Sequence, residues 1–204
     1  YLDGDLSLMA VPAEEAMEIE WRQSLIDQGK IRYIGVSNET AFGVMRYLHL
    51  ADKHDLPRIV TIQNPYSLLN RSFEVGLAEV SQFEGVELLA YSCLAFGTLT
   101  GKYLNGAKPA GARNTLFSRF TRYSSEQSQK AVAAYVDIAK RHGLDPAQMA
   151  LAFVRRQPFV ASTLLGATTM TQLQANVESL QLELSEEVLA EIEAVHQVYT
   201  YPAP

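Results

Sequence analysis

Short apolar runs alternate with longer amphipathic segments along most of this chain. The apolar runs are rich in β-branched and aromatic residues, as is typical of strands; they cover residues 6–11, 31–36, 58–63, 86–92 and 159–166. The segments between them repeat apolar residues at helical spacing; these predicted helices cover 13–28, 41–53, 72–82, 125–141, 146–156, 169–180 and 185–198. This alternation predicts successive βα units around a parallel sheet.

The stretch from Cys93 to Tyr123 departs from this alternation. It contains four glycines, one proline and several basic residues. A segment of this length and composition is typical of a functional loop. We expect a short helical turn within it, over residues 99–102.

Two architectures place alternating strands and helices around a parallel sheet. An open doubly wound sheet that binds a dinucleotide carries G-x-G-x-x-G after its first strand, and this chain has no such motif. A (β/α)8 barrel places its chemistry on the loops that follow the strands. Polar or small residues follow the predicted strands here: Ser37-Asn38, Gln63-Asn64, Tyr91-Ser92 and Gly166-Ala167-Thr168. The sequence therefore favours the barrel.

Composition narrows the class of protein without indicating a function. The 204 residues are 48% hydrophobic and carry a net charge of −6, without the dense basic stripe that binds nucleic acid. No apolar run approaches the ~20 residues that cross a membrane. Cys93 is the only cysteine, so no internal disulfide forms and a reducing, cytoplasmic location is expected. We expect one domain over residues 1–204, with no membrane or nucleic-acid partner.

The segment GTLTGKY, residues 97–103, has the composition of a phosphate-binding loop. A P-loop has four residues between its glycines and a serine or threonine after its lysine. Here three residues separate Gly97 from Gly101, and Tyr103 follows Lys102. The spacing and the missing magnesium ligand exclude a nucleoside triphosphatase of this type. For this segment alone, a glycine-rich turn with a solvated lysine and an anion site both remain open.

The ends of the other predicted strands offer groups for one kind of ligand. Ser37, Asn38 and Gln63 provide a hydroxyl and two carboxamides that match a primary amide. Tyr91 offers an aromatic face, and residues 166–169 precede a helix whose free N–H groups favour phosphate. An amide, a flat ring and phosphates together describe a nicotinamide dinucleotide. Taken singly, each residue also fits a helix cap, a core position or a backbone contact.

Four longer stretches carry a family resemblance. GKIRYIGVSN, TIQNPYSLLNR, LLAYSCLAFGTLTGKY and STLLGATTMTQLQANVESL, in this order, resemble the aldo-keto reductases. The resemblance is closest to the bacterial branch that is similar to potassium-channel β subunits, and it covers roughly residues 13–200. It implies an α/β fold of the (β/α)8 barrel type, here with the strands from the fourth or fifth to the eighth. It also implies that NADPH lies across the top of the barrel, without a Rossmann domain, and that carbonyls are reduced.

The resemblance further implies which residues hold the cofactor. It assigns the nicotinamide carboxamide to Ser37, Asn38 and Gln63, the ring to Tyr91, the pyrophosphate to Ser92, Leu94 and Gly97, the 2′-phosphate side to Lys102 with Arg113 or Arg119, and the adenosine end to Gly166, Thr168, Gln172 and Asn176. Lys102 and a nearby arginine favour NADP over NAD, because a 2′-phosphate is a dianion. Cys93 and Ala175 depart from the family pattern, which has proline and often a glutamate that contacts adenine.

The catalytic residues of the family are not found in this sequence. The family uses an aspartate, a tyrosine, a lysine and a histidine from its first four strands, and the tyrosine protonates the carbonyl oxygen. The chain begins at or near the fourth strand, and residues 1–12 match poorly; if 6–11 is that strand, Ala10 replaces the histidine. Lys30 precedes its strand, and Tyr66 follows a strand without a lysine partner. We therefore expect no catalytic residue and no metal ligands.

The number of strands also bears on partners. Four or five strands cannot close an eight-stranded barrel, and the edges left exposed favour pairing with other strands. We therefore expect self-association, as two half-barrels, or pairing with an N-terminal barrel fragment. The leading hypothesis is an NADPH-dependent oxidoreductase chain that supplies the cofactor-binding half, lacks the catalytic tetrad and acts on a small-molecule aldehyde or ketone. The alternatives are an inactive NADP-binding or regulatory module and a barrel fragment that binds nothing.

Overall fold

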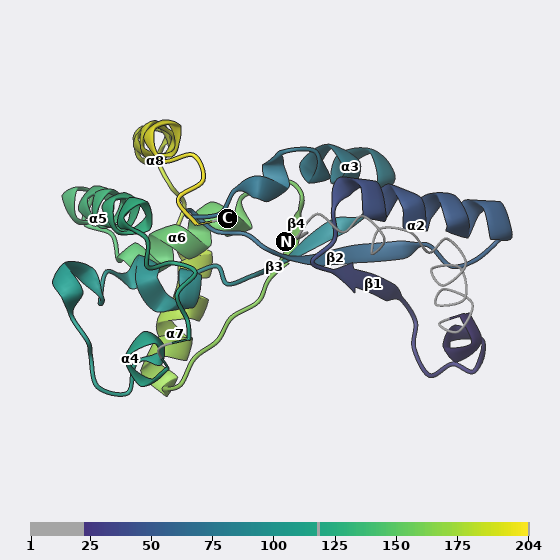
Figure 1. The fold of residues 1–204 in the computed structure, drawn as a ribbon, viewed down its shortest axis with the longest axis horizontal. Helices are drawn as coiled ribbons and strands as arrows, with labels where there is room; N and C mark the ends of the chain where they lie inside the picture. The colour runs from purple at the N-terminus through teal and green to yellow at the C-terminus, as the bar shows by residue number, and fades with distance from the viewer. Residues whose placement is uncertain (1–22, 118, 204) are drawn as a thin grey trace.

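A computed structural model describes residues 23–117 and 119–203 of the chain (Figure 1). The strand predicted over 6–11 and the first part of the helix predicted over 13–28 lie outside the described residues. Residues 23–27 are helical, and Gly29 turns the chain with a φ of +66°. From there on, strands and helices alternate as the sequence predicts.

Four parallel strands form one sheet whose order follows the chain. They are β1 (Ile34–Ser37), β2 (Ile59–Pro65), β3 (Glu87–Tyr91) and β4 (Val160–Thr163). Ser37 pairs with Gln63, Gln63 with Leu89, and Leu89 with Ser162, so these four residues form one row across the sheet. A parallel sheet with a helix in every connection is the α/β arrangement of part of a (β/α)8 barrel. The predicted fold class is confirmed.

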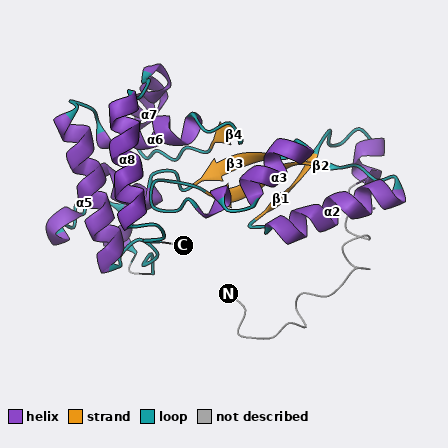
Figure 2. Cartoon of the chain, turned by 90° about the horizontal axis from the view of Figure 1, so that it is seen from above, coloured by secondary structure: helices purple, strands orange, loops and turns teal. Residues whose placement is uncertain are grey.

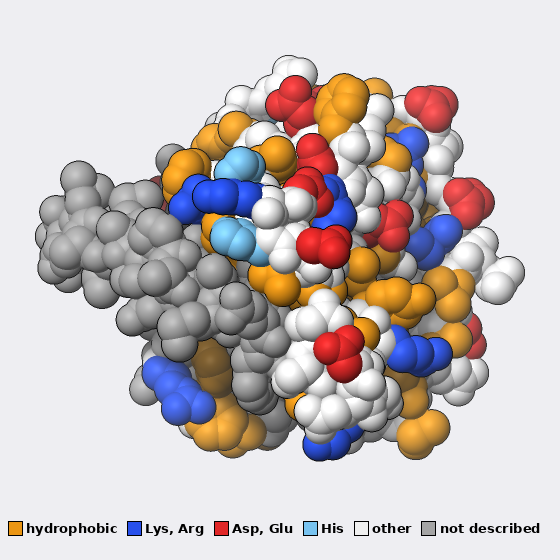
Figure 3. Space-filling view, turned by 90° about the vertical axis from the view of Figure 1, so that its right-hand side faces the viewer, with side chains coloured by type: hydrophobic (Ala, Val, Ile, Leu, Met, Phe, Trp, Pro, Cys, Tyr) orange, Lys and Arg blue, Asp and Glu red, His pale blue; other side chains and the backbone are white. Residues whose placement is uncertain are grey.

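Most helices keep bounds close to the predicted ones. They are α2 (Ala41–His54), α3 (Leu77–Glu84), a short α4 (Arg113–Leu116), α5 (Glu126–Arg141), α6 (Pro146–Arg155), α7 (Met170–Glu178) and α8 (Glu186–Val198). His49 and His54 of α2 are exposed, and Figure 3, which faces this end of the molecule, shows histidine side chains on the surface. Within the described ranges, no helix combines the length and the apolarity needed to cross a membrane.

The helix predicted over 72–82 is broken in the structure. Gly76 has a φ of +90°, a left-handed conformation that only glycine adopts without strain. The 3₁₀ helix η2 (Ser72–Glu74) therefore precedes the break, and α3 begins after it. Apolar spacing continues through the break, which is why periodicity alone predicts one helix.

Two predicted strands and one predicted turn also have different bounds. The strand predicted over 31–36 begins three residues later, at Ile34, where pairing with β2 starts. The strand predicted over 159–166 is limited to the four residues of β4, whose last register pair with β3 joins Thr163 to Ala90. The turn predicted over 99–102 forms earlier, as the 3₁₀ helix η3 (Ala95–Thr100).

Side-chain caps define the starts of five helices. Thr40, Ser125, Asp145, Thr169 and Ser185 each accept a hydrogen bond from a backbone N–H in the first turn of α2, α5, α6, α7 and α8. Such a cap contributes about 1 kcal/mol relative to alanine. The starts of these helices are therefore encoded locally in the sequence.

The two faces of the sheet differ in exposure. The set that faces the helices is buried and comprises Ile34, Ile62, Leu88 and Ala90. The alternating set is exposed or half-buried and comprises Gly35, Ser37, Thr61, Gln63, Leu89 and Tyr91. Figure 1 shows α2 and α3 along the same side of the sheet. In a closed barrel the second set of residues would point into the barrel.

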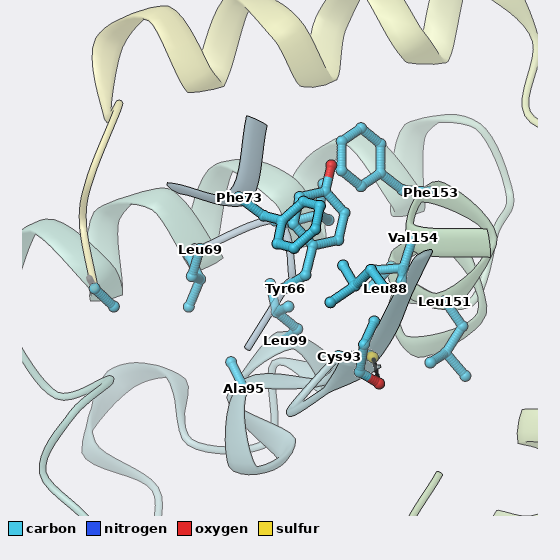
Figure 4. Close-up of a cluster of buried hydrophobic side chains, with 14 of the residues drawn as sticks. Tyr66, Leu69, Phe73, Leu88, Cys93, Ala95, Leu99, Leu151, Phe153 and Val154 are labelled. Carbon is cyan, nitrogen blue, oxygen red and sulfur yellow. Dashed lines mark hydrogen bonds between the residues drawn. The ribbon is translucent and has the colours of Figure 1, made fainter. Parts of the chain in front are cut away.

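One hydrophobic core joins the sheet to α5, α6 and α8. Figure 4 shows Tyr66 beside Phe153 of α6. The Tyr66 ring lies edge-on to Phe159 with 5.3 Å between centroids, and Phe73 lies 5.1 Å from the same ring. Aromatic pairs of this kind contribute about 0.5–1.5 kcal/mol beyond the area that they bury. Figure 2 shows α5 and α8 side by side at the end of the molecule opposite α2.

A partly buried ionic cluster ties the loop after β2 to α8. Arg71 Nε and Nη2 donate to the Glu74 carboxylate at 2.7 and 2.8 Å, and Arg71 Nη1 donates to Glu193 at 2.8 Å. The Tyr66 hydroxyl also donates to Glu74, at 2.5 Å. Burial alone would raise the pKa of Glu74, but the hydrogen bonds from Arg71 and Tyr66 outweigh burial and hold this pKa below its ordinary value.

Candidate functional site

The residues predicted to hold the nicotinamide amide lie where β1 and β2 end. Ser37 Oγ and the Asn38 N–H each donate to the Gln63 carbonyl, both at 3.0 Å. Asn38 has a φ of +55°, a left-handed conformation that asparagine adopts more readily than most residues. The side chains of Ser37, Asn38 and Gln63 are all exposed at this rim. Two neighbouring strands thus present their polar ends in one place.

Tyr91 joins this rim from the end of β3. Its hydroxyl donates to Asn38 Oδ1 at 2.6 Å, across 53 residues of sequence, and its ring is half-buried. Because Asn38 Oδ1 accepts this bond, the two N–H groups of Asn38 Nδ2 remain as donors. A cleft of about 460 Å³ beside β1 is lined by Ser37 and Gln63 of the same rim. The rim therefore combines amide groups with a fixed aromatic ring.

Arg122 belongs to this rim, although the sequence pattern does not single it out. Burial alone would lower the pKa of the Arg122 guanidinium, but its interactions with Tyr91 and Tyr123 raise this pKa. Tyr123 is 2% exposed, and burial raises its own pKa. The only sequence signal is the frequency of basic residues in this loop, which does not distinguish Arg122 from Arg113 or Arg119.

The loop that leaves β3 runs through an unusual series of left-handed residues. Positive φ angles occur at Ser92 (55°), Ala95 (49°), Phe96 (57°), Gly97 (84°) and Gly101 (79°). A residue with a side chain loses roughly 1–2 kcal/mol in this region. Such strained backbone persists only where its surroundings fix it, and it is common at ligand sites. The loop that carries the predicted pyrophosphate residues therefore follows a tight backbone path, with half-buried Leu94 inside it.

Lys102 lies directly over Gly97. A Cβ atom on Gly97 would be 2.9 Å from Lys102 Nζ, closer than non-bonded atoms approach, and 3.1 Å from Lys102 Cε. The ammonium group also lies 5.2 Å from the Tyr103 ring centroid. Two residues that the sequence assigns to neighbouring phosphates are therefore in contact, and Gly97 leaves the space that the lysine fills.

Two arginines predicted for the same phosphate side stack on aromatic rings. The Arg113 guanidinium lies 5.5 Å from the Phe96 ring and 5.6 Å from the Phe120 ring. The Arg119 guanidinium lies 5.1 Å from Phe120 and 5.8 Å from Phe117. Both side chains are exposed. These contacts orient two cations without neutralising them, because no carboxylate takes part.

The residues predicted for the adenosine end lie before and within α7. The backbone N–H and Oγ1 of Thr168 both donate to Gln172 Oε1, at 2.9 and 3.0 Å. Gly166 is exposed, and a Cβ placed on it would have no atom within 4 Å. Asn176 is 6% exposed and lines a second cleft, beside β4. The Ala175 carbonyl accepts a hydrogen bond from Gln148 Nε2 at 2.9 Å.

The predicted residues thus lie in three groups. The strand-end rim contains Ser37, Asn38, Gln63 and Tyr91; the loop group contains Ser92, Leu94, Gly97, Lys102 and Arg113; the α7 group contains Gly166, Thr168, Gln172 and Asn176. Within residues 23–117 and 119–203, no hydrogen bond connects one group with another.

Groups that could act as acids or nucleophiles are buried or differently engaged. Tyr66 does not reach a cleft: it is fully buried, its hydroxyl donates to Glu74, and burial raises its pKa. Cys93 is 2% exposed, and burial raises the pKa of its thiol to about 12. Lys30 is exposed before β1, at the end of the sheet opposite the rim. In the described part of the chain, no tyrosine hydroxyl is hydrogen-bonded to a lysine.

The structure brings together one cluster of side chains that could bind a metal, and the spacing of these residues in the sequence does not indicate it. Ligand atoms of His142, Glu187 and Glu191 lie within 4.8 Å of one another, where the end of α5 meets α8. Glu191 is already occupied: its Oε1 is 3.1 Å from His142 Nε2, and its Oε2 accepts from Arg141 at 2.5 Å. The cluster is therefore an ion-pair network between α5 and α8.

Comparison with known proteins identifies the family. The family model described as Aldo/keto reductase family matches residues 9–197. The chain is 94% identical to "Protein tas" of Escherichia coli over 176 residues, which are 86% of this chain and 51% of that protein. It is 36% identical over 174 residues to an "Aldo-keto reductase" of Babesia bovis, covering 82% of this chain and 60% of that protein.

A third relative is named as a putative channel subunit. The chain is 33% identical over 196 residues to a "Putative voltage-gated potassium channel subunit beta" of Schizosaccharomyces pombe, covering 91% of this chain and 56% of that protein. The chain spans about half the length of the curated relatives that it matches. The match over residues 9–197 includes all three groups of predicted site residues. The chain therefore belongs to the aldo/keto reductase family of oxidoreductases.

Proposed function

We propose that this chain forms the NADP(H)-binding part of an aldo-keto reductase, in which a hydride is transferred to an aldehyde or ketone. The observation that carries the proposal is the meeting of Asn38, Gln63 and Tyr91 at one rim, joined by hydrogen bonds from three different strand ends. NADPH supplies the hydride when it is bound. The residues of this chain bind and orient it.

At the strand-end rim, the side-chain amides of Asn38 and Gln63 bind the carboxamide of the nicotinamide by hydrogen bonds. Asn38 Nδ2 and the Gln63 side chain are free to donate and accept, while Ser37 Oγ is held by the Gln63 carbonyl. Tyr91 is fixed through its hydroxyl, so its ring face is available for stacking. The hydrogen bond between Tyr91 and Asn38 couples the ring contact to the amide contact.

The loop after β3 binds the phosphates of the cofactor. The left-handed backbone around Gly97 allows close approach of a pyrophosphate to Ser92 and Leu94. Lys102 and Arg113 present cations beside this turn, which suits the 2′-phosphate of NADP. A charge-assisted hydrogen bond to a phosphate contributes about 1.5–3 kcal/mol. This contribution is the physical reason to propose NADPH rather than NADH.

The α7 group binds the adenosine end of the cofactor. Thr168 and Gln172 are exposed and already paired with each other, so they form a preformed polar surface at the start of α7. Gly166 leaves open space beside them. Asn176 lies deeper, along the cleft beside β4. We propose that the adenine and its ribose lie across these four residues.

We propose further that the described residues do not supply the catalytic acid. Tyr66 and Tyr91 are the tyrosines that follow strand ends, and their hydroxyls donate to Glu74 and Asn38 rather than facing a lysine. Binding without turnover is therefore the expected behaviour of this chain alone. An NADP-binding module that regulates a partner is the second candidate, and it is favoured by the relative that is named as a putative potassium channel subunit.

Binding and turnover are measured separately. NADPH is titrated by its fluorescence, and NADH serves as the ligand that lacks the 2′-phosphate. Lys102→Met is expected to weaken NADPH at least tenfold, which is about 1.4 kcal/mol or more for a lost charge-assisted bond. The same variant should leave NADH within about twofold, because only the phosphate contact is lost. Lys108→Met, an exposed lysine of the same loop, is the matched control.

Each outcome decides one part of the proposal. An equal loss for NADPH and NADH would remove Lys102 from the 2′-phosphate side. Failure of the unmodified chain to bind either nucleotide would overturn the cofactor proposal and leave a barrel fragment. Oxidation of NADPH in the presence of 4-nitrobenzaldehyde by the chain alone would contradict the absence of a catalytic acid.

A further inference from the structure

Tyr103 connects the two cations that are proposed to face the 2′-phosphate. It follows Lys102 directly and belongs to the same loop as Arg113. In a P-loop, the position after the lysine is a serine or threonine that binds magnesium. Here it holds a tyrosine that is only 9% exposed. The ring and the hydroxyl of this tyrosine contact two different parts of the loop.

The ring of Tyr103 supports Lys102. The Lys102 ammonium lies 5.2 Å from the ring centroid, within the distance of about 6 Å over which a cation is attracted to an aromatic face. The same ammonium lies close to Gly97, where a Cβ atom would displace it. The tyrosine ring and the glycine backbone therefore hold the lysine in one place.

The hydroxyl of Tyr103 fixes the start of α4. The Asn114 N–H donates to Tyr103 Oη at 3.2 Å. The helix begins at Arg113, and its N-cap residue Ala112 makes no side-chain cap, so the first N–H groups of α4 need another acceptor. The phenol oxygen serves as that acceptor from a distant part of the loop. Arg113 is thereby held at its backbone as well as by the rings on which its guanidinium stacks.

The two cations have no negative partner in the loop. The sequence contains no acidic residue between Glu87 and Glu126, whereas five lysines and arginines lie in this stretch. Among the described residues, neither Lys102 nor Arg113 takes part in a salt bridge. A phosphate monoester carries a charge of about −1.5 to −2 at neutral pH. Such a group is matched by two cations that are held together.

We propose that Tyr103 is a positioning residue that holds Lys102 and Arg113 as a pair for one phosphate monoester, the 2′-phosphate of NADP(H). The inference rests on the proposed function and specifies it: Arg113, rather than Arg119, is the partner of Lys102. The Tyr103 hydroxyl bonds to the helix that begins with Arg113, whereas Arg119 stacks on Phe117 and Phe120. Cations that are already held in place lose less conformational entropy when they bind.

Titration of the full chain with NADPH and with NADH tests the hydroxyl. Tyr103→Phe keeps the ring and removes the hydroxyl, so it should weaken NADPH about fivefold, the effect of one hydrogen bond, and leave NADH within about twofold. Tyr135→Phe is the matched control. It removes the same atom from a tyrosine that is 1% exposed and whose hydroxyl has no hydrogen-bond partner among the described residues. The control should leave the ratio of the two affinities unchanged.

Double variants show which cation the hydroxyl acts through. In an Arg113→Met background, adding Tyr103→Phe should weaken NADPH less than about twofold, because the arginine that the hydroxyl positions is already absent. In a Lys102→Met background, the same change should keep most of its effect, because the hydroxyl bonds to α4 and not to the lysine.

The role of the ring is tested with Tyr103→Leu. This variant removes the aromatic face as well as the hydroxyl, so it should weaken NADPH more than Tyr103→Phe does. The additional loss should disappear in the Lys102→Met background, because no ammonium remains over the ring. Circular dichroism of each variant shows whether the chain remains folded.

Hydrogen exchange at the Asn114 amide provides a measurement without nucleotide. The amide should exchange faster in Tyr103→Phe, which removes its acceptor, and at the original rate in Tyr135→Phe. This result depends on the fold of the loop and not on the identity of the ligand.

Four results would overturn the inference. Equal weakening of NADPH and NADH by Tyr103→Phe would mean that the hydroxyl acts on the fold and not on the phosphate. Additive losses in Tyr103→Phe/Arg113→Met would mean that the tyrosine does not act through the arginine. Unchanged exchange at Asn114 would mean that the bond to α4 is absent in solution. Failure of the unmodified chain to bind either nucleotide would overturn the proposed function together with the ligand of this pair, and the exchange rate would still decide whether Tyr103 holds α4.

Discussion

The strand-end rim and the loop after β3 are two parts of one proposed site, and they are built differently. At the rim, Asn38, Gln63 and Tyr91 are held by strand pairing and by hydrogen bonds between residues far apart in sequence. In the loop, Gly97 and Lys102 are held by left-handed backbone over a few residues. The rim should therefore depend on the stability of the whole sheet and core, and the loop on local backbone conformation.

The largest effect is expected from the ionic cluster that follows β2. Arg71→Met would leave the partly buried Glu74 carboxylate without its cation, which should destabilise the fold by about 3 kcal/mol. Urea unfolding measures this change, and NADPH affinity should fall only as the folded fraction falls. Arg58→Met, which breaks the more exposed pairs with Asp52 and Glu84, should cost only about 1 kcal/mol. Equal effects of the two variants would contradict the importance of burial.

An intermediate effect is expected in the loop. Gly97→Ala forces a side chain into left-handed backbone, at roughly 1–2 kcal/mol, and also displaces Lys102. Gly111→Ala is a matched control, because Gly111 has a φ of +73° with no atom near a new Cβ. The difference between the two variants isolates the crowding by Lys102. NADPH affinity should fall several-fold in Gly97→Ala alone, measured by fluorescence titration.

The same loop prediction can be tested for coupling. In the double variant Gly97→Ala/Lys102→Ala, the Nζ and Cε atoms that crowd the new Cβ are both removed, so the stability loss should return to that of Gly111→Ala. Strict additivity of the two single changes would show that the lysine does not lie over the glycine in solution.

The smallest effect is expected at the exposed network of α8. Hydrogen bonds from Arg141 and His142 lower the pKa of Glu191 from 4.5 to about 2. A carboxyl with a lowered folded-state pKa stabilises the fold above pH 4.5, and this stabilisation is lost as the pH falls towards 2. Urea midpoints from pH 7 to pH 2 should show this loss, and Glu191→Gln should remove it. Glu187→Gln on the same helix is the control; a loss of equal size there would exclude Glu191 as its source.

Strand positions and the residues at their ends could be predicted because their signals are local. Apolar runs are short and end in polar residues such as Ser37 and Gln63. In a parallel sheet, all these ends converge at one rim. The hydrogen bond between Tyr91 and Asn38 agrees with that expectation. Helix starts could be predicted for the same reason, since each cap acts within its own first turn.

Features that depend on the path of the chain could not be predicted. The break at Gly76 keeps apolar spacing on both sides, so periodicity gives no warning of it. The contact of Arg122 with Tyr91 requires the loop to return to the rim. The His142–Glu191 network joins residues 49 apart that share no motif. In each case the deciding interaction is tertiary, and a single sequence carries no local sign of it.

The bond between Arg71 and Glu193 joins residues 122 apart, and this separation has a consequence for synthesis on the ribosome. At 5–20 residues per second, roughly 6–24 s pass between the two residues. Throughout that interval Glu74 and Tyr66 can form their local contacts, but α8 has not yet covered them. The nascent chain therefore exposes a strand end and an aromatic cluster until its last helix emerges, which is when chaperones would be expected to bind it.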